Sequence, residues 1–526
     1  MPYEAHAHDR ATDVLDVLIV GAGPTGLVLA LWLSRMGVRV RIVDQTAAPG
    51  TTSRALVVQA RTLELYRPFG LADQVQSRGL RVEAVNLWAR GEKRGRAEFG
   101  PAGTGLSPYP FAIIFPQDEH EQLLIGELAR RGITVERNTR LVSFDAGMGG
   151  VVARLQTGEG PPTACRAAYL AGCDGARSTV RSAIGADFPG GTYEHLFYVA
   201  DVTAQGPVMN GELHLDLDEA DFVFAFPLAA DGRARLIGTI RGAGEGDAQL
   251  GWDDVSPEVL RRMKIDVQQV NWFSTYHVHH RVASQFRVGR VFLLGDAAHI
   301  HSPVGGQGMN TGIGDAVNLA WKLAGVLKNG ADSRLLDTYE PERIGFARRL
   351  VATTDRAFQL ATSRSAAARP IRRSVVPALL PRLFARPEMR RLMFRIVSQM
   401  QIAYRHSTLS HGHAHGVHGG DRLPWVPGDP DNFAPLNGTD WQAHVYGHAE
   451  PDVARACSAR GIDVHPMRWT PEAGEAGFVD GGLYLIRPDG YLGLVDPKAD
   501  IERLARYWDQ RVGAPVREIS PALLRP

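Results

Sequence analysis

A glycine-rich stretch near residue 300 combines residue types that could hold a flat, charged ring system. Asp296 follows an apolar run at 291–294, which predicts a buried strand that brings this acid to a sheet edge, within reach of a ribityl hydroxyl. Glycines without Cβ atoms would let a flat ring approach the backbone, and the amides of the following helix would favour its negative charge. These glycines are Gly305, Gly306 and Gly308. The stretch therefore predicts a flavin-binding loop.

A second motif near the N-terminus has the spacing of a dinucleotide-binding unit. An apolar strand is predicted over 14–20, a helix over 27–36 and a second strand over 38–43. Between the first strand and the helix lies the pattern G-x-G-x-x-G, in which the glycines serve the tight turn, the approach of a pyrophosphate and close helix contact. An acid at the end of the second strand can hold a ribose. The residues expected to bind an adenine dinucleotide are Gly21, Gly23, Pro24, Thr25, Gly26 and Asp44.

A third cluster again runs from an apolar strand, 169–173, into an acid and a glycine, Asp174 and Gly175. In this order and at these separations, the three motifs resemble those of the class A flavoprotein aromatic monooxygenases, the para-hydroxybenzoate hydroxylase and phenol hydroxylase-like family. The resemblance implies that the first motif binds the ADP part of FAD. It also implies that Asp174 touches FAD and assists NAD(P)H, while Asp296 and the loop after it hold the ribityl chain and the isoalloxazine.

The resemblance carries over further positions one by one. Arg54 matches an arginine that approaches the pyrophosphate, Gln117 a glutamine that meets the ribityl chain, and Val142 a backbone position beside the adenine. Met309 and Asn310 match backbone contacts to the flavin ring. Residues expected near the substrate are His214, Phe224, Phe226 and Pro303.

The alternating residues Phe222, Phe224 and Phe226 allow two interpretations. One is the core face of a strand; the other is a wall of the substrate pocket. For His277, His279 and His280 we favour packing or hydrogen bonding over catalysis, whereas the roles of His299 and His301 stay open.

The family chemistry implies a specific reaction. NAD(P)H would reduce FAD and leave, and dioxygen would then form a flavin C4a-hydroperoxide that hydroxylates a phenolic or polyketide-like aromatic substrate. Alternatives on the same scaffold are Baeyer-Villiger oxidation and antibiotic inactivation. A further alternative is a non-catalytic FAD-binding protein that sequesters or chaperones an intermediate. The residue that deprotonates the substrate varies within the family and is not identified here.

Composition limits the possible partners. With 58 basic and 57 acidic residues, the chain gives no reason to expect nucleic acid or a membrane as a partner. Three cysteines without metal or disulfide spacing suit the cytoplasm. We interpret the histidines at 411–418, which alternate with glycine, as a solvated loop, and we expect no metal. The partners expected are a small aromatic substrate and dioxygen, with the chain as a monomer or homodimer.

The motifs predict an α/β fold with a discontinuous FAD-binding, Rossmann-like (GR2-type) domain at 14–80, 115–188 and 285–355. The segments 81–114 and 189–284 contain period-2 strands and predict an antiparallel substrate-binding sheet. A flexible N-terminus at 1–13 and a helical segment at 356–419 complete this division. Residues 420–526 resemble the thioredoxin-like C-terminal domain of the phenol hydroxylase branch. Because they contain no C-x-x-C motif, a structural role is expected for them.

Overall fold

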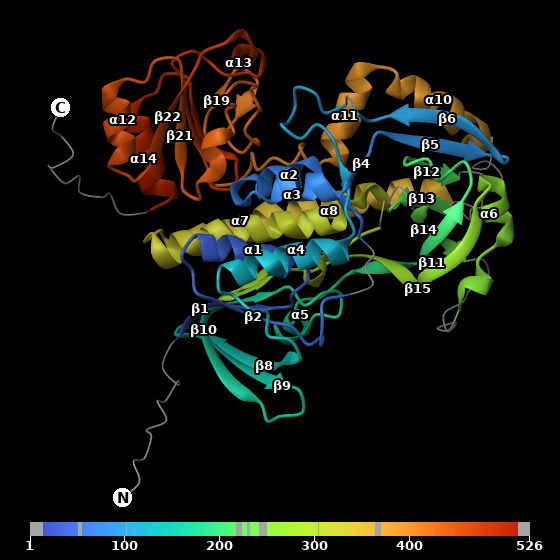
Figure 1. Ribbon diagram of the computed structural model, residues 1–526. Helices are drawn as coiled ribbons and strands as arrows, with labels where there is room; N and C mark the ends of the chain where they lie inside the picture. The colour runs from blue at the N-terminus through green and yellow to red at the C-terminus, as the bar shows by residue number, and fades with distance from the viewer. Residues whose placement is uncertain are drawn as a thin grey trace, which may run out of the picture.

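The computed structural model describes residues 14–50, 55–100, 102–216, 223–228, 232–240, 250–302, 304–362 and 370–513, and the statements below concern these residues. Figure 1 shows a central region of helices over a sheet, a second sheet on the right and the C-terminal region at the upper left. Among the described residues, no helix combines the length and the apolar character needed to cross a bilayer.

The central sheet carries all three glycine-containing motifs at the ends of its strands. Its main path runs β16-β17-β10-β1-β2, and β10 pairs in parallel with both β1 and β17. An antiparallel hairpin, β8–β9, extends from β10 and projects at the bottom of Figure 1. The strands are β1 (Leu15–Val20), β2 (Val40–Val43), β8 (Thr139–Gly147), β9 (Gly150–Thr157), β10 (Thr163–Gly172), β16 (Arg287–Val288) and β17 (Val291–Leu293).

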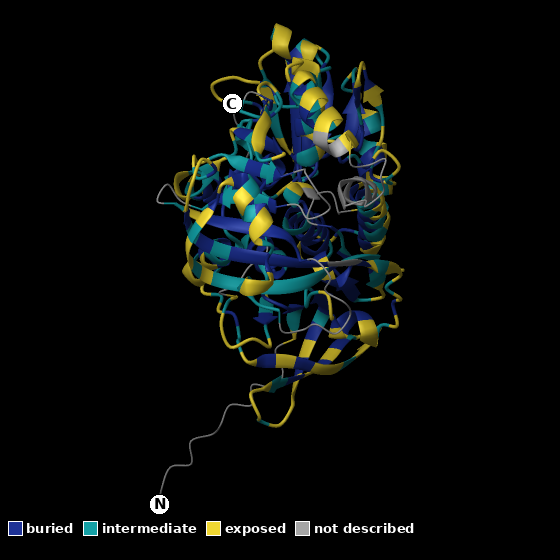
Figure 2. Cartoon of the chain, turned by 90° about the vertical axis from the view of Figure 1, so that its right-hand side faces the viewer, coloured by how far each residue is buried: buried dark blue, intermediate teal, exposed yellow. Residues whose placement is uncertain are grey.

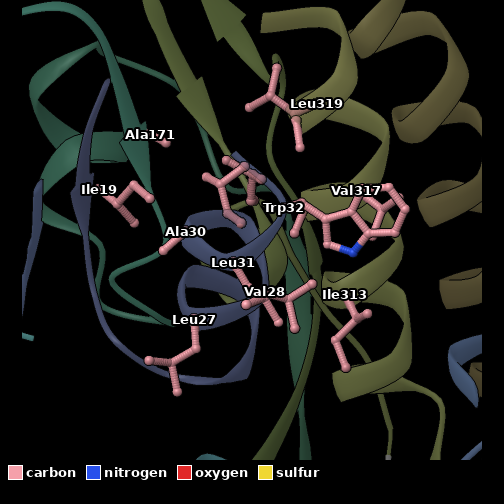
Figure 3. Packing of buried hydrophobic residues seen from close by; sticks show 14 of the residues in the cluster. Ile19, Leu27, Val28, Ala30, Leu31, Trp32, Ala171, Ile313, Val317 and Leu319 are labelled. Carbon is pink, nitrogen blue, oxygen red and sulfur yellow. The ribbon is translucent and has the colours of Figure 1, made fainter. Parts of the chain in front are cut away.

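Two helices that follow glycine motifs pack against each other beside this sheet. α1 (Pro24–Arg35) is buried from Gly26 to Leu33, as expected for a helix whose residues are apolar all round. Figure 3 shows its side chains between those of β1 and those of α7 (Gly308–Lys328). α1 begins at Pro24, earlier than the expected residue 27, because proline suits the first turn of a helix. One hydrophobic core therefore packs both motifs together.

Smaller elements complete the central region. A three-stranded sheet has the order β3-β7-β4. Its strands are β3 (Val57–Val58), β4 (Leu80–Arg81) and β7 (Ile113–Ile114). The α-helices here are α2 (Ala60–Tyr66), α3 (Leu71–Arg78), α4 (Gln117–Arg130), α5 (Thr179–Ala183) and α8 (Tyr339–Thr362). The short 3-10 helices are η1 (Arg67–Phe69), η3 (Gly295–Ala297), η4 (Val304–Gly306) and η5 (Ser333–Thr338).

The second sheet has eight strands in the order β18-β15-β11-β14-β13-β12-β5-β6. It is antiparallel, as expected, except that β12 and β5 pair in parallel. These two strands come from distant parts of the chain, and no short hairpin constrains their direction. The strands are β5 (Ala84–Ala89), β6 (Glu92–Glu98), β11 (Gly190–Gln205), β12 (Leu213–Asp216), β13 (Val223–Pro227), β14 (Arg233–Ile240), β15 (Asp266–Val282) and β18 (His299–Ile300).

Helices cover the second sheet on its outer side and at one end. Figure 2 views the molecule from this side. Along β12 and β13 of this sheet, buried residues alternate with partly exposed ones. The covering elements are η2 (Trp252–Asp254), α6 (Pro257–Met263), the π-helix η6 (Ile371–Val375), α10 (Val376–Phe384) and α11 (Pro387–Val397).

The C-terminal region has a four-stranded sheet in the order β22-β21-β23-β24. β21 pairs in parallel with β22, whereas β23 is antiparallel to both β21 and β24. This βαβ unit followed by a ββα unit is the thioredoxin-like arrangement. Its elements are β21 (Gln442–Tyr446), α12 (Pro451–Ser458), β22 (Asp463–Met467), α13 (Pro471–Glu475), β23 (Leu483–Ile486), β24 (Leu492–Asp496) and α14 (Ile501–Arg511), preceded by η7 (Ala434–Asn437).

Two expected boundaries differ from the observed elements. α8 runs through residue 355, so the expected division between 355 and 356 falls inside a helix. The expected helical segment at 356–419 ends with α11 at Val397, and its last part forms the short hairpin β19 (His413–Ala414) and β20 (Val417–His418). This hairpin contacts β24, so it belongs to the C-terminal region by contact.

Candidate active site

A cavity of about 1090 Å³ lies between the carboxyl edge of the central sheet and the second sheet. Its lining joins the N-terminal glycine loop, the Asp-Gly turn and the loop before α7 to aromatic side chains of β13 and β15. Segments separated by more than 200 residues therefore meet around one space. This is the carboxyl-edge crevice where open α/β sheets bind ligands.

The three glycines of the N-terminal loop have different surroundings. Gly21 has φ +104°, and a Cβ built there would lie 2.2 Å from the Cys173 carbonyl oxygen. A Cβ on Gly26 would lie 2.0 Å from the Gly21 carbonyl oxygen. At Gly23, which lines the cavity, a Cβ would meet nothing within 4 Å. Gly21 and Gly26 therefore serve the turn and the helix contact, and Gly23 leaves space open on the cavity side.

Asp44 lies at the end of β2 beside this loop and lines the cavity. One carboxylate oxygen accepts a hydrogen bond from the Ala22 amide at 2.7 Å. The other accepts from the amide and the hydroxyl of Thr46, at 2.8 and 2.6 Å. The carboxylate is thereby held against the glycine loop, where a ribose would bind.

Asp174 lines the same cavity and also supports a helix. Its carboxylate accepts from the Ser178 hydroxyl at 2.5 Å and from the Val180 amide at 3.1 Å, at the start of α5. Burial raises the pKa of Asp174, which the hydrogen bond from Ser178 partly offsets. A Cβ on the neighbouring Gly175, whose φ is +78°, would meet nothing within 4 Å. The Asp-Gly turn therefore combines helix capping with open space at the cavity.

The loop before α7 turns through two glycines in the left-handed region. Gly305 and Gly306 have φ of +79° and +60°, and both line the cavity with Gly308 and Met309. Left-handed backbone favours glycine at such positions. Asp296 also lines the cavity. It belongs to η3, which precedes β18 in the chain, whereas these glycines follow β18.

Asn310 is buried and fixes the conformation of this loop. Its amide nitrogen donates to the carbonyl oxygens of Val57 and Gly306, both at 2.9 Å. Its side-chain oxygen accepts from the Gln59 amide at 2.9 Å and from the Thr62 hydroxyl at 2.8 Å. The side chain of Gln59 donates to the Gly305 carbonyl oxygen at 3.0 Å. Gln59 was not among the expected site residues, because it lies in no local motif.

A buried ionic network behind the loop was also missed. The Asp315 carboxylate contacts His299 Nε2 at 2.7 Å, accepts from the Gly295 amide at 3.0 Å and pairs with Arg343 at 2.6 Å. Burial alone would raise the pKa of Asp315, but the charges of Arg343 and His299 outweigh it and lower this pKa. The network joins the Gly-Asp turn to α7 and α8. His299 is therefore one of the buried residues that hold the site in place.

The positions inferred from the family resemblance differ in whether they line the cavity. Gln117 begins α4 and lines the cavity, with its amide donating to Glu121 at 2.8 Å. The side chain of Val142 is 43% exposed, and the lining instead includes its neighbours Arg140 and Leu141. The expected positions Arg54 and Pro303, and the aromatic residue Phe222, lie outside the described residues.

Phe224 and Phe226 line the cavity, with ring centroids 5.9 Å apart in a stacked arrangement. Their alternating neighbours Val223 and Ala225 face the core instead. The core-face interpretation therefore applies to the neighbours, because a one-residue step along a strand changes the face.

His214 is a correction, because the structure places it away from the cavity. Its neighbour Leu213 lines the cavity, whereas His214 is 1% exposed and accepts a hydrogen bond from Trp88 Nε1 at 2.8 Å. Burial lowers the pKa of His214 to about 4. It is a buried, neutral histidine on the opposite face of the strand.

Four further residues that line the cavity come from β15 and from the end of α11. His277 and His279 of β15 line the cavity, so the packing role that we favoured for them describes only part of their surroundings. The Nδ1 atom of His279 lies 2.7 Å from the Thr192 hydroxyl oxygen. Phe394 and Ser398, at the end of α11, close the cavity from a segment without a recognisable motif.

The residues present fit FAD. Open space at Gly23 and Gly175 suits the pyrophosphate, and Asp44 suits the ribose. The glycines before α7 line the cavity, where a flat ring would lie against their backbone. The amides at the start of α7 would favour negative charge on that ring. The described residues contain no cluster of three or more histidine, cysteine or acidic side chains that could hold a metal ion.

Comparison with known proteins agrees with this fit. Residues 14–354 match the FAD binding domain family model. The chain is 35% identical over 516 residues to 6-methylpretetramide 4-monooxygenase of Streptomyces rimosus, covering 90% of each chain. It is 35% identical over 352 residues to rifampicin monooxygenase of Streptomyces venezuelae, covering 66% of this chain and 72% of that protein.

Solved structures show the same fold along the chain. OxyS anhydrotetracycline hydroxylase from Streptomyces rimosus is 30% identical, with a TM-score of 0.77 over 96% of this chain and 100% of that one. CabE, an aromatic hydroxylase from angucycline biosynthesis, is 28% identical, with a TM-score of 0.77 over the same shares. The chain therefore belongs to the FAD binding domain family and is a flavoprotein monooxygenase of the class A aromatic hydroxylase type.

Proposed function

We propose that this enzyme uses NAD(P)H and dioxygen to hydroxylate a polycyclic phenol of the polyketide type. The observation that carries the proposal is the single cavity that joins the dinucleotide loop to the aromatic wall of the second sheet. Relatives named for tetracycline-type substrates, with 35% and 32% identity over about nine-tenths of this chain, support the substrate class.

The proposal gives each group of residues a task. Bound FAD would supply the transfer of one oxygen atom from dioxygen after reduction by NAD(P)H. Gly23 would bind its pyrophosphate, Asp44 its adenosine ribose and Gln117 its ribityl chain, and Asp296 would accept from a ribityl hydroxyl. Phe224 and Phe226 would lie against the substrate ring and, with Phe394 of α11, exclude water from it.

Antibiotic inactivation is a second candidate, because two relatives with 35% identity are named rifampicin monooxygenases. The same scaffold would then hydroxylate a finished antibiotic. As part of the proposal we also expect a cytoplasmic monomer or homodimer. The three unpaired cysteines, all in described segments, suit a reducing compartment.

The decisive test is anaerobic reduction of the FAD-loaded protein by NADPH and by NADH with candidate substrates. We would add anhydrotetracycline, rifampicin or 2-naphthol, measure the rate of flavin bleaching, and identify products by mass after admitting oxygen. We expect a polycyclic phenol to accelerate bleaching and to gain one oxygen atom. Rifampicin as the sole accelerator would favour the second candidate. Unaccelerated reduction with every compound would contradict both.

A further inference from the structure

His301 lies where the two halves of the cavity meet. It follows β18, the edge strand of the second sheet, which pairs with β15 at Arg281 and Val282. A Cβ built on Gly308, at the start of α7, would lie 3.7 Å from both Cε1 and Nε2 of the His301 ring. The imidazole lines the cavity and is therefore placed between the flavin loop and the substrate sheet.

The hydrogen bonding of this ring defines its tautomer. Nδ1 lies 2.8 Å from the Ser302 carbonyl oxygen, which can only accept, so Nδ1 carries the proton. In a neutral imidazole the other nitrogen then has a free lone pair. Burial lowers the pKa of His301 to about 4, which keeps the ring neutral at neutral pH. His301 Nε2 is consequently a hydrogen-bond acceptor.

This acceptor is buried and has no hydrogen-bond partner in the described part of the chain. A buried acceptor without a donor is costly, and proteins retain such groups where a ligand satisfies them. Phe224, Phe226 and Tyr276 line the same cavity as His301, and their rings would hold an aromatic ring flat. A hydroxyl on that ring would supply the missing donor.

We propose that His301 Nε2 accepts the hydrogen bond of the substrate's phenolic O–H and takes this proton as oxygen is added to the ring. This inference rests on the proposed function. A ring carbon gives an electron pair to one oxygen atom of the dioxygen that reduced FAD has activated, so the O–O bond breaks, and the second oxygen atom takes up the ring C–H proton and leaves as water. As the new C–O bond forms, the phenolic O–H bond breaks and its electrons form a C=O bond. The proton passes to Nε2. Loss of the ring C–H proton then restores the aromatic ring, and the imidazolium returns its proton to the carbonyl oxygen.

The weak basicity of His301 is compatible with this step. A group with a pKa of about 4 leaves a resting phenol, whose pKa is about 10 as for tyrosine, protonated. Addition of oxygen withdraws electrons from the ring and makes the O–H strongly acidic. Proton transfer to His301 therefore becomes favourable only at that moment, which is the timing that general base catalysis requires.

The first test measures binding without turnover in the FAD-loaded enzyme. The probes are 2-naphthol and 2-methoxynaphthalene, which has no donor. We expect the wild type to bind 2-naphthol about five- to tenfold more tightly, the size of one hydrogen bond, and His301→Ala to remove this preference. A preference that survives in His301→Ala would overturn the proposal, as would its absence from the wild type. Binding of neither probe by the wild type would count against the proposed function itself.

The second test separates acceptance of the hydrogen bond from transfer of the proton. His301→Gln keeps an acceptor oxygen but no base, so we expect 2-naphthol to bind within threefold of wild type while kcat falls at least 100-fold. The affinity for FAD should stay within twofold. Wild-type kcat would refute proton transfer, and weakened FAD binding would show that Nε2 faces the cofactor. The matched control is His448→Gln, whose side chain is 81% exposed.

Discussion

The glycines of the N-terminal loop differ in what the absence of a Cβ atom allows at each position. Gly21 and Gly26 prevent clashes within the protein, with backbone oxygens at 2.2 and 2.0 Å from a hypothetical Cβ. Gly23 has no such neighbour, and its missing side chain matters only to a bound molecule. Stability and cofactor binding therefore depend on different glycines within one motif.

We predict that Gly23→Ala lowers FAD affinity at least tenfold and leaves the unfolding of the apoprotein nearly unchanged, because the added methyl occupies the path of the pyrophosphate. Titration with FAD and thermal unfolding without it would measure the two effects. Gly126→Ala is the matched control: this glycine of α4 also has nothing within 4 Å, and alanine there should add about 0.5 to 1 kcal/mol of stability. Equal FAD affinity in both variants would contradict the assignment.

At the scale of elements, a buried ionic cluster joins α7 and α8 to the C-terminal region. Glu342 of α8 pairs with Lys322 of α7 at 2.8 Å and with Arg487, which follows β23, at 2.8 Å. Although burial would raise the pKa of Glu342, the charges of Arg487 and Lys322 lower it well below its usual range. Because Lys322 and Glu342 are at most 1% exposed, removal of the Glu342 charge leaves the buried Lys322 without its carboxylate partner, whereas Arg487 keeps Asp489 at 2.6 Å.

We expect Glu342→Gln to lower the free energy of unfolding by about 3 to 5 kcal/mol, the usual cost of breaking a buried ion pair. Denaturant unfolding followed by tryptophan fluorescence would measure it, since Trp321 lies beside the cluster. Glu159→Gln, in an exposed turn, should change stability by less than about 0.5 kcal/mol. A small effect at residue 342 would mean that the C-terminal region is attached mainly by apolar contacts.

At the scale of the whole molecule, several histidines are buried in the neutral form. Burial lowers the pKa of His120 and His444 to about 3 and that of His214 and His301 to about 4. The unfolded chain binds these protons near pH 6.5, whereas the folded chain binds them only at these lower values. Between pH 6.5 and 4 the unfolded state therefore holds more protons, and acidification destabilises the fold.

We predict that the unfolding temperature falls steadily as pH decreases from 7 to 4.5. His444 contributes to this fall because it is fully buried and both its ring nitrogens lack a partner among the described residues. His444→Leu should flatten the dependence, whereas the exposed His448→Leu should leave it unchanged. Parallel pH curves for wild type and His444→Leu would show that His444 does not titrate during unfolding.

The sequence by itself determined the elements that carry the cofactor motifs. Strand, glycine loop, helix and acid follow one another within about 30 residues, and such local patterns depend on backbone geometry and on apolar periodicity. The segment 189–284 was also predicted to contain alternating strands, and β12, β13 and β14 lie within it. The sequence did not predict which face each strand turns toward the cavity. His214 was therefore placed wrongly, and Phe224 was left with two interpretations.

Only the tertiary structure decided which distant residues complete the site. Gln59, Asp315, Arg343 and the end of α11 have no motif. They support the Gly-Asp turn, the flavin loop or the cavity through contacts such as those between residues 20 to 246 positions apart in the chain. The acceptor role of His301 likewise depends on a carbonyl next to one nitrogen and on burial of the other. Such contacts arise from how the sheets and helices pack together, and a periodicity along the chain contains no information about them.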